Sequence, residues 1–302
     1  MSPGVLAQSP GRPAVSVVVL SYNRPHLLAR ALASITNQEY ANLEILVVDN
    51  RSAASDQVAA LVRQFPLVQL LLQPTNTGFA TGMNIGLRAA RGDFIHLTED
   101  DILLESGFYE ALIGPAVKRP GDLFSGIIHE DAGDQSLFAG VHLQIDRRFV
   151  YDAFPPPQPQ QTDPYVVGML IGCMIFGGRA AFDAVGFFRD EFFVYFEDAE
   201  FCWRARKAGV TLWVVPAARG RHIGTATGGP SPFIEFHKLK NYLATNLLYM
   251  PMTAVLPLTV KFFGYTSVRI AIKTKNPMLL LRIWAWALAN GVRYIRERAK
   301  IG

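Results

Sequence analysis

The segment Phe94-Ile-His-Leu-Thr-Glu-Asp-Asp101 places three consecutive acidic residues after a short apolar stretch. Residues 94–97 predict a strand, so Glu99, Asp100 and Asp101 would lie at its carboxyl end. Three adjacent carboxylates repel one another, and a fold that brings them together usually supplies a cation. Oxygen ligands of this kind suit Mg²⁺ or Mn²⁺. A solvated acidic turn is the alternative for the tripeptide alone, but its position at a strand end favours a metal site.

Strands and helices alternate on both sides of this segment. Continuous apolar runs predict buried parallel strands, and apolar residues at helical spacing predict the helices between them. The expected strands are 15–20, 43–48, 68–72 and 94–97, and the expected helices begin at Pro25 and span 56–65 and 80–91. This order predicts an α/β fold with an open, mostly parallel, Rossmann-like sheet and helices on both faces. Ligands bind beyond the carboxyl ends of such strands, where Ser21, Asp49 and the acidic triplet are expected.

The second half of the chain is less regular. Residues 168–176 predict a strand, 198–208 a helix, and 211–215 a strand that ends at Pro216. Residues 154–164 predict a proline-rich loop, and residues 220–230, which include His222, predict a loop rich in glycine and threonine. At the start of the predicted helix, Asp198 could act as a general base or could simply cap the helix.

Length and cysteine content limit the class of protein. A chain of 302 residues, half of them hydrophobic, suits one α/β domain with an appendage. Two cysteines exclude a disulfide framework or a cysteine-rich zinc domain, and they fit a reducing cytoplasm. Residues 1–14 are expected to be a flexible terminus, without the apolar core of a secretory signal.

The positive charge is concentrated near the carboxyl end. Residues 238–302 carry eleven Lys or Arg and one acidic residue, a net charge of +10, whereas the preceding residues have a net charge of −6. Residues 241–260 have no charge over a length that could span a bilayer, but Pro251 and Pro257 interrupt them. Amphipathic helices in the membrane interface explain this pattern better.

We therefore expect residues 233–302 to be a helical appendage that associates with an anionic membrane rather than with nucleic acid. The alternative is that these helices cover the catalytic domain or form a homo-oligomer interface.

Several motifs in order resemble the inverting family 2 glycosyltransferases, which have the GT-A fold. They are Val17-Val-Val-Leu-Ser-Tyr-Asn-Arg24, Ile45-Leu-Val-Val-Asp-Asn50, the segment 76–86, the segment 92–101, Tyr195-Phe-Glu-Asp-Ala-Glu-Phe-Cys-Trp-Arg204, and His222 with the Gly and Thr that follow it. The similarity is greatest to the rhamnosyl- and galactofuranosyltransferase-like branch that builds bacterial surface polysaccharides. The resemblance implies a catalytic domain over residues 15–232, with a nucleotide-sugar-binding half (15–101) and an acceptor-binding half (102–232).

The resemblance also implies a role for each motif residue. The donor, UDP- or dTDP-linked, would be bound by Ser21, Tyr22, Asn23, Asp49, Gly78, Asn84 and Asp100. The divalent metal, Mn²⁺ or Mg²⁺, would be bound by Asp101, Glu99 and His222. Asp198 would be the catalytic base with Glu197 beside it at the acceptor, and Glu200 stands at the acceptor side where aspartate is commoner.

Without the family, two of these residues have a second interpretation. Asp49 could cap the turn after its strand, and His222 could be a surface histidine.

These roles imply metal-dependent, inverting transfer of a sugar to a hydroxyl of a glycan or polyprenyl-linked acceptor, at the cytoplasmic face of the membrane. Two other functions stay open. A nucleotidyltransferase also pairs a nucleotide with clustered carboxylates, but the basic, glycine-rich phosphate loop expected of it is not found in this sequence. A catalytically silent sugar-binding scaffold would not need the acidic triplet together with Asp198 and His222.

Overall fold

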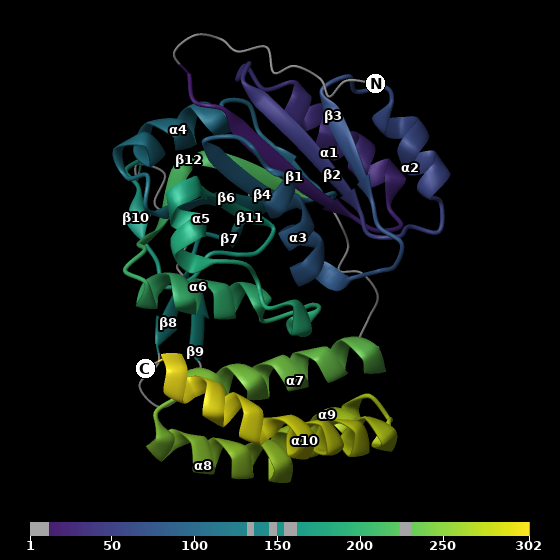
Figure 1. The fold of residues 1–302 in the computed structure, drawn as a ribbon, viewed down its shortest axis with the longest axis vertical. Helices are drawn as coiled ribbons and strands as arrows, with labels where there is room; N and C mark the ends of the chain where they lie inside the picture. The colour runs from purple at the N-terminus through teal and green to yellow at the C-terminus, as the bar shows by residue number, and fades with distance from the viewer. Residues whose placement is uncertain (1–11, 132–135, 145–149, 154–161, 224–230, 302) are drawn as a thin grey trace.

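The computed structural model describes residues 12–131, 136–144, 150–153, 162–223 and 231–301, so most of the proline-rich loop and residues 224–230 lie outside the described residues. A layered α/β domain is followed by a layer of helices packed beneath it (Figure 1). The strands are β1 (Val15–Ser21), β2 (Leu43–Asp49), β3 (Val68–Leu72), β4 (Phe94–Glu99), β5 (Ile102–Leu104), β6 (Leu123–Glu130), β7 (Ser136–Phe138), β8 (Val141–Gln144), β9 (Val150–Ala153), β10 (Tyr165–Val166), β11 (Met174–Gly178) and β12 (Leu212–His222).

The helices of the first domain are α1 (Pro25–Thr36), α2 (Ser55–Val62), α3 (Gly78–Ala89), α4 (Phe108–Lys118), α5 (Arg179–Val185), the short 3₁₀ helix η1 (Asp190–Phe192) and α6 (Glu197–Lys207). The carboxyl-terminal helices are α7 (Pro232–Tyr249), α8 (Met252–Lys261), the π-helical turn η2 (Phe262–Thr266), α9 (Ser267–Lys273) and α10 (Pro277–Ile301).

Most strands form one mixed sheet in the order β10-β12-β6-β11-β4-β1-β2-β3, with β5 on β12 and β7 on β6. The neighbours of β1 are parallel to it, as is β3 to β2, which confirms the predicted parallel first half. β11 lies antiparallel between β4 and β6, so the second half is mixed. Helices cover both faces, as predicted: α1, α2 and α4 pack on one core, and α3, α5 and α6 on the other.

The central strand β1 explains why the sheet is covered on both faces. All seven of its residues are buried. Because successive side chains point to opposite faces, Val17 and Val19 enter the core under α1, and Val18 and Leu20 enter the core under α3. Burial on both faces is typical of a parallel strand inside an α/β sheet.

Strand register brings the predicted site residues to one edge. Ser21 pairs with Asp49, and Leu20 pairs with Glu99, so the three strands β1, β2 and β4 end side by side. The N–H of Asp100 then donates to the carbonyl of Leu20 at 3.1 Å, which carries β4 directly into the acidic triplet.

Two predictions for the second half were wrong. Of residues 168–176, only 174–176 belong to a strand, because the apolar residues before Met174 form a buried loop instead. The strand expected to end at Pro216 continues as β12 to His222, through a shift in register between Val214 and Arg219. Such a bulge is where a sheet accepts proline. His222 therefore ends a strand and does not belong to a loop.

The carboxyl-terminal region is helical, as expected, and α7 begins at Pro232. A continuous helix over residues 241–260 does not form, since α7 ends at Tyr249 and α8 begins at Met252 after Pro251. Among the described residues, one helical run, Met252–Lys273, is long and apolar enough by length and composition to cross a membrane. The inner faces of these helices enclose a separate core that includes Phe192 of η1.

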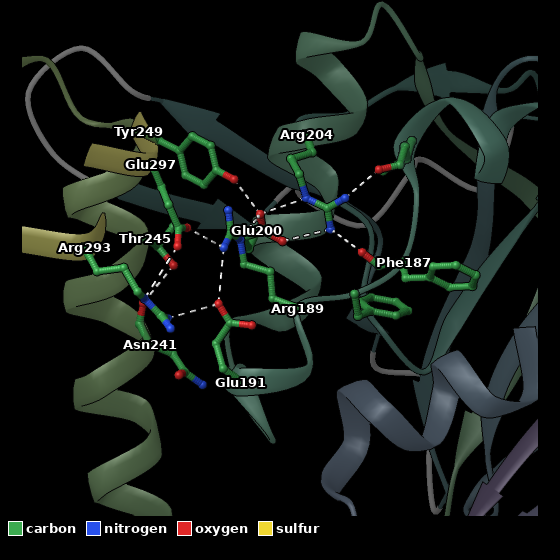
Figure 2. Close-up of polar contacts among 12 residues, drawn as sticks. Phe187, Arg189, Glu191, Glu200, Arg204, Asn241, Thr245, Tyr249, Arg293 and Glu297 are labelled. Carbon is green, nitrogen blue, oxygen red and sulfur yellow. Dashed lines mark hydrogen bonds and ion pairs between the residues drawn. The ribbon is translucent and has the colours of Figure 1, made fainter. Parts of the chain in front are cut away.

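A buried ionic network joins α6 to these helices. Glu200 is fully buried and accepts from Arg204 at 2.8 Å, from Arg189 at 3.1 Å and from the hydroxyl of Tyr249. Arg189 also pairs with Glu297 of α10 at 2.9 Å (Figure 2). The family resemblance implies a place for Glu200 at the acceptor side. Its carboxylate instead faces the interface between α6 and the carboxyl-terminal helices.

The close approach of α3 to β1 gives a first prediction. A Cβ at Gly86 would overlap Cγ1 of Val18, so Gly86→Ala should lower the free energy of unfolding by about 1–3 kcal/mol although alanine is the better helix former. The matched control is Gly291→Ala in α10, where the new Cβ would lie 3.9 Å from Leu247 and should add up to about 1 kcal/mol. Urea unfolding measures both. Equal effects at the two glycines would contradict the proposed close packing.

The ionic network gives a second prediction. Glu200→Gln should lower the free energy of unfolding by about 3 kcal/mol or more, because two arginines would lose their buried partner. Asp131→Asn is the control, since its pair with Arg30 is half exposed on both sides and is worth less than about 1 kcal/mol. If thermal and urea unfolding move as little for Glu200→Gln as for the control, the network contributes nothing to the interface.

Candidate active site

A cavity of about 440 Å³ opens between the carboxyl edge of the sheet and the start of α6. The predicted metal and catalytic residues Glu99, Asp101, Glu197, Asp198 and His222 all line it. The other lining residues are Arg24, Phe79, Ile128, Phe138, Ile171, Gly172, Cys173, Val194 and Tyr195. Segments from β4, α6 and β12 thus meet in one place.

Asp101 and His222 lie together at the metal side of the cavity. Nε2 of His222 is 3.6 Å from Oδ2 of Asp101, and Oδ1 of Asp101 is buried with no hydrogen-bond partner among the described residues. No three His, Cys, Asp or Glu side chains in the described chain could hold an ion by themselves. Mg²⁺ and Mn²⁺ commonly take one or two protein ligands and fill the rest with substrate phosphates and water. The two side chains therefore fit such an ion.

Arg24, for which the sequence predicts no role, lines the cavity beside the acidic residues. Its guanidinium pairs with Asp100 and with Asp101, each at 2.5 Å. Its place between β1 and Pro25 could have indicated this, because β1 and β4 end side by side.

The raised pKa values of two carboxyl groups indicate that this part of the site needs positive charge nearby. Burial, with the neighbouring Asp101 and Asp100, raises the pKa of Glu99 to about 8. Burial raises the pKa of Asp100 to about 7, although Arg24 and Ser21 act in the opposite direction. The cluster therefore holds its charge poorly without a cation and gains from one.

Four of the residues expected to bind the donor nucleotide lie along the edge of the sheet beside the cavity and form hydrogen bonds there. They are Ser21, Tyr22, Asn23 and Asp100. The hydroxyl of Ser21 donates to Asp100 at 2.8 Å, and the N–H of Tyr22 donates to the same oxygen at 3.3 Å. Asn23 joins this edge to the loop after β2, accepting from the N–H of Ala53 at 2.7 Å. Tyr22 is 43% exposed, which leaves its ring available to a ligand.

Asp49 is fully buried, and both its oxygens are engaged locally. Oδ1 accepts from the N–H and hydroxyl of Ser52, and Oδ2 accepts from the hydroxyl of Ser55 at 2.8 Å. In this structure it holds the turn after β2, which was the second interpretation of this residue.

Gly78 and Asn84 do not line the cavity. Gly78 has a positive φ of 79°, and a Cβ there would overlap the backbone of Phe193. Asn84 is fully buried and exchanges hydrogen bonds with the backbone of Phe188 at 2.9 Å. Both residues therefore position the segment that leads to α6.

Asp198 lies in the first turn of α6 with its carboxylate in the cavity. Oδ1 accepts from the N–H of Ala199 at 2.8 Å, and Oδ2 accepts from the N–H of Gly172 at 3.2 Å. Burial raises its pKa even though these donors oppose the rise. Burial and Asp198 raise the pKa of Glu197 well above its ordinary value, and Oε2 of Glu197 has no partner among the described residues. The buried loop before β11 thus supplies the N–H that orients Asp198.

Comparison with known proteins agrees with this arrangement. A family model, glycosyl transferase family 2, matches residues 16–186, more than half of the chain. The N-acetylglucosaminyl-diphospho-decaprenol L-rhamnosyltransferase of Mycobacterium tuberculosis (strain ATCC 25618 / H37Rv) is 26% identical over 254 residues, 75% of this chain and 82% of that protein. The GalNAc(5)-diNAcBac-PP-undecaprenol beta-1,3-glucosyltransferase of Campylobacter jejuni is 33% identical over 140 residues, 44% of this chain and 45% of that protein. The match therefore spans less than half of this second relative.

Solved structures show the same fold at low identity. GalNAc-T7, crystallised with UDP, GalNAc and Mn²⁺, has a TM-score of 0.70 at 15% identity, over 93% of this chain and 58% of that one. The mannosyltransferase PcManGT from Pyrobaculum calidifontis, with GDP-Man and Mn²⁺, has a TM-score of 0.55 at 15% identity, over 99% and 88%. The fold is therefore of the expected GT-A type, and the chain is a glycosyltransferase that belongs to glycosyl transferase family 2.

Proposed function

We propose that this chain transfers a sugar from a UDP- or dTDP-linked donor to a hydroxyl of a lipid-linked glycan, with a divalent metal and with inversion. One observation carries the proposal: Asp101 and His222 share a single cavity with Asp198, a partly buried carboxylate that two N–H groups orient. A diphosphate and an acceptor hydroxyl could meet in that space.

On the donor side, Asp101 and His222 would hold Mn²⁺ or Mg²⁺, with Glu99 beside them. When bound, the ion would offset the negative charge of the leaving diphosphate. Ser21, Tyr22, Asn23 and Asp100 would bind the nucleoside along the adjoining edge, while Asp49 holds the turn after β2 beside them. Arg24, which faces Asp101, adds positive charge near the diphosphate.

On the acceptor side, Asp198 would accept the proton of the attacking hydroxyl. Burial raises its pKa, which makes the carboxylate a stronger base than an exposed aspartate. The N–H groups of Ala199 and Gly172 keep it oriented while the hydroxyl oxygen attacks the anomeric carbon. Attack from the side opposite the diphosphate inverts that carbon, and no bond to the enzyme forms.

The acceptor class is inferred from the relatives and from the exposed surface. Both relatives are named for substrates that carry a prenol diphosphate. Ten of the eighteen large hydrophobic side chains exposed among the described residues lie in α8, η2, α9 and α10. They are Met252, Leu256, Val260, Tyr265, Ile272, Met278, Leu281, Leu288, Val292 and Ile295.

Exposed lysines and arginines are interspersed with these apolar residues along the same stretch of chain. They include Lys261, Arg269, Lys273, Lys275, Arg282 and Arg296. A second copy of the chain would bring like charges together, whereas anionic headgroups would complement them. The proposed location is therefore the cytoplasmic face of the membrane, where the helices lie in the interface near a polyprenyl-linked acceptor.

The function is tested by following nucleoside diphosphate release from UDP-, dTDP-, GDP- and ADP-sugars with a polyprenyl-diphosphate glycan as acceptor. UDP or dTDP release should require Mn²⁺ or Mg²⁺. Asp198→Asn should lower turnover by about a hundredfold or more while nucleotide binding, measured by calorimetry, persists. Asp101→Ala should abolish the response to metal, and Asp122→Asn, whose side chain bonds Thr211 and Trp213, should leave turnover unchanged.

The other outcomes of this assay identify the alternatives. Full activity in excess chelator would remove the metal from the proposal. Pyrophosphate release would indicate a nucleotidyltransferase, and nucleotide binding without any turnover would indicate a silent scaffold.

Membrane association is tested by flotation of the full-length protein with vesicles. Binding should require anionic lipid, weaken as salt is raised, and fall sharply in Leu288→Glu/Val292→Glu on the exposed face of α10. The control is Leu67→Glu/Leu72→Glu, two exposed leucines that precede and end β3, which should float as the parent does. A parent protein that stays in solution with anionic vesicles at low salt, and sediments as a dimer, would assign this surface to self-association.

A further inference from the structure

The backbone that leads into Glu197 and Asp198 is held from outside at five consecutive carbonyl oxygens, those of residues 191–195. Nζ of Lys240 donates to the carbonyl of Glu191 at 2.5 Å. Nδ2 of Asn241 donates to the carbonyls of Phe192 at 2.7 Å, Val194 at 3.0 Å and Tyr195 at 2.6 Å. The N–H groups of Phe79 and Ala80, in the first turn of α3, donate to the carbonyl of Phe193 at 2.5 and 3.2 Å.

This segment has an unusual backbone conformation. Phe193, Tyr195 and Phe196 have φ values of 63°, 66° and 68°, and none of them is glycine. Side chains disfavour this left-handed region, so such residues persist only where the surroundings fix them. Three of them directly before the proposed base mean that the segment does not hold its shape by local preference. The external donors therefore help to fix its shape, together with the local bond from the N–H of Val194 to the carbonyl of Phe192 at 2.7 Å.

Asn241 is the donor that contacts the segment most extensively. It belongs to α7, in the carboxyl-terminal region, and its side chain is fully buried. Its Nδ2 reaches three carbonyls, while its Oδ1 has no partner among the described residues. Buried polar groups normally have hydrogen-bond partners, and here the described partners of the side chain are all on its Nδ2. The contacts with the 192–195 backbone therefore determine the orientation of this amide.

We propose that Asn241 is a positioning residue, whose amide holds the 192–195 backbone so that Asp198 faces the acceptor hydroxyl. Asn241 does not line the cavity and acts through the loop. This inference rests on the proposed role of Asp198 as the base. It makes α7 a part of the catalytic apparatus in addition to any part in membrane binding.

The proposal separates the two halves of the site. The donor edge is built on the ends of β1, β2 and β4, and Asn241 contacts none of these strands in its hydrogen bonds. Loss of the amide should therefore change catalysis and leave donor binding intact. A displacement of the base of about 1 Å is enough to lower turnover about a hundredfold.

The test compares Asn241→Ala with Asn246→Ala. Asn246 lies on the same helix, is also buried with no partner for its Oδ1 among the described residues, and donates to the carbonyl of Tyr242 in its own helix. Asn241→Ala should lower kcat roughly ten- to a hundredfold while the dissociation constant for the nucleotide stays within about twofold. Asn246→Ala should change kcat by less than about twofold even if its unfolding midpoint falls as much.

Hydrogen–deuterium exchange of the peptide covering residues 190–199 gives a readout that does not depend on the reaction. Asn241→Ala should speed exchange there selectively, and Asn246→Ala should not. Unchanged exchange would show that Asn241 does not hold the 192–195 backbone. Faster exchange with a normal kcat would show that holding this backbone does not position the base. If Asn241→Ala does not fold, Asn241→Asp keeps the size, removes the amide donors and is measured in the same way.

The role of Asp198 is checked separately in the parent protein. If Asp198→Asn retains full turnover, the assignment of the base fails. The exchange experiment still decides whether Asn241 holds the loop.

Discussion

Three carboxylates at the end of a buried strand require positive charge beside them, and much of the site follows from that requirement. Burial raises the pKa of Glu99 to about 8 and that of Asp100 to about 7 even with Arg24 beside them, so the cluster holds its charge poorly without a further cation. Arg24 supplies part of the compensation from the end of β1. A bound divalent cation would add to it, so the electrostatic demand that holds Arg24 in place would also favour a cation at this edge.

The sequence could predict the sheet edge because strand periodicity and strand ends are local features. Runs such as Val17 to Val19 identify buried parallel strands, and parallel strands place their carboxyl ends together. The same reasoning failed where burial did not mean a strand. Residues 168–173 form a mostly buried loop instead: Met169 and Leu170 enter the core, and Ile171, Gly172 and Cys173 line the cavity. Pro216 predicts the end of a strand, but a bulge allows β12 to continue past it to His222.

The contacts of the carboxyl-terminal helices could not be predicted from sequence, because they depend on segments far apart along the chain. Asn241 begins an uncharged stretch whose composition indicates membrane affinity and nothing about the active site. Its amide nevertheless forms hydrogen bonds with three backbone carbonyls about fifty residues earlier in the chain. Glu200 looked like an acceptor-site residue from its place in the motif. Its carboxylate instead meets Arg189 and Tyr249, which join α6 to the helices (Figure 2).

The two sides of the cavity are therefore stabilised by different means. Glu99 ends β4 and Asp101 comes two residues later, so the hydrogen-bonded neighbours that fix the register of this strand also position both residues. Asp198 follows a segment that makes no such ladder and contains three left-handed residues other than glycine. Its shape depends on donors from α3 on one side and α7 on the other. Since α7 also shares a core with α10, the helices that present an apolar, basic surface to the outside belong to the same unit as the base.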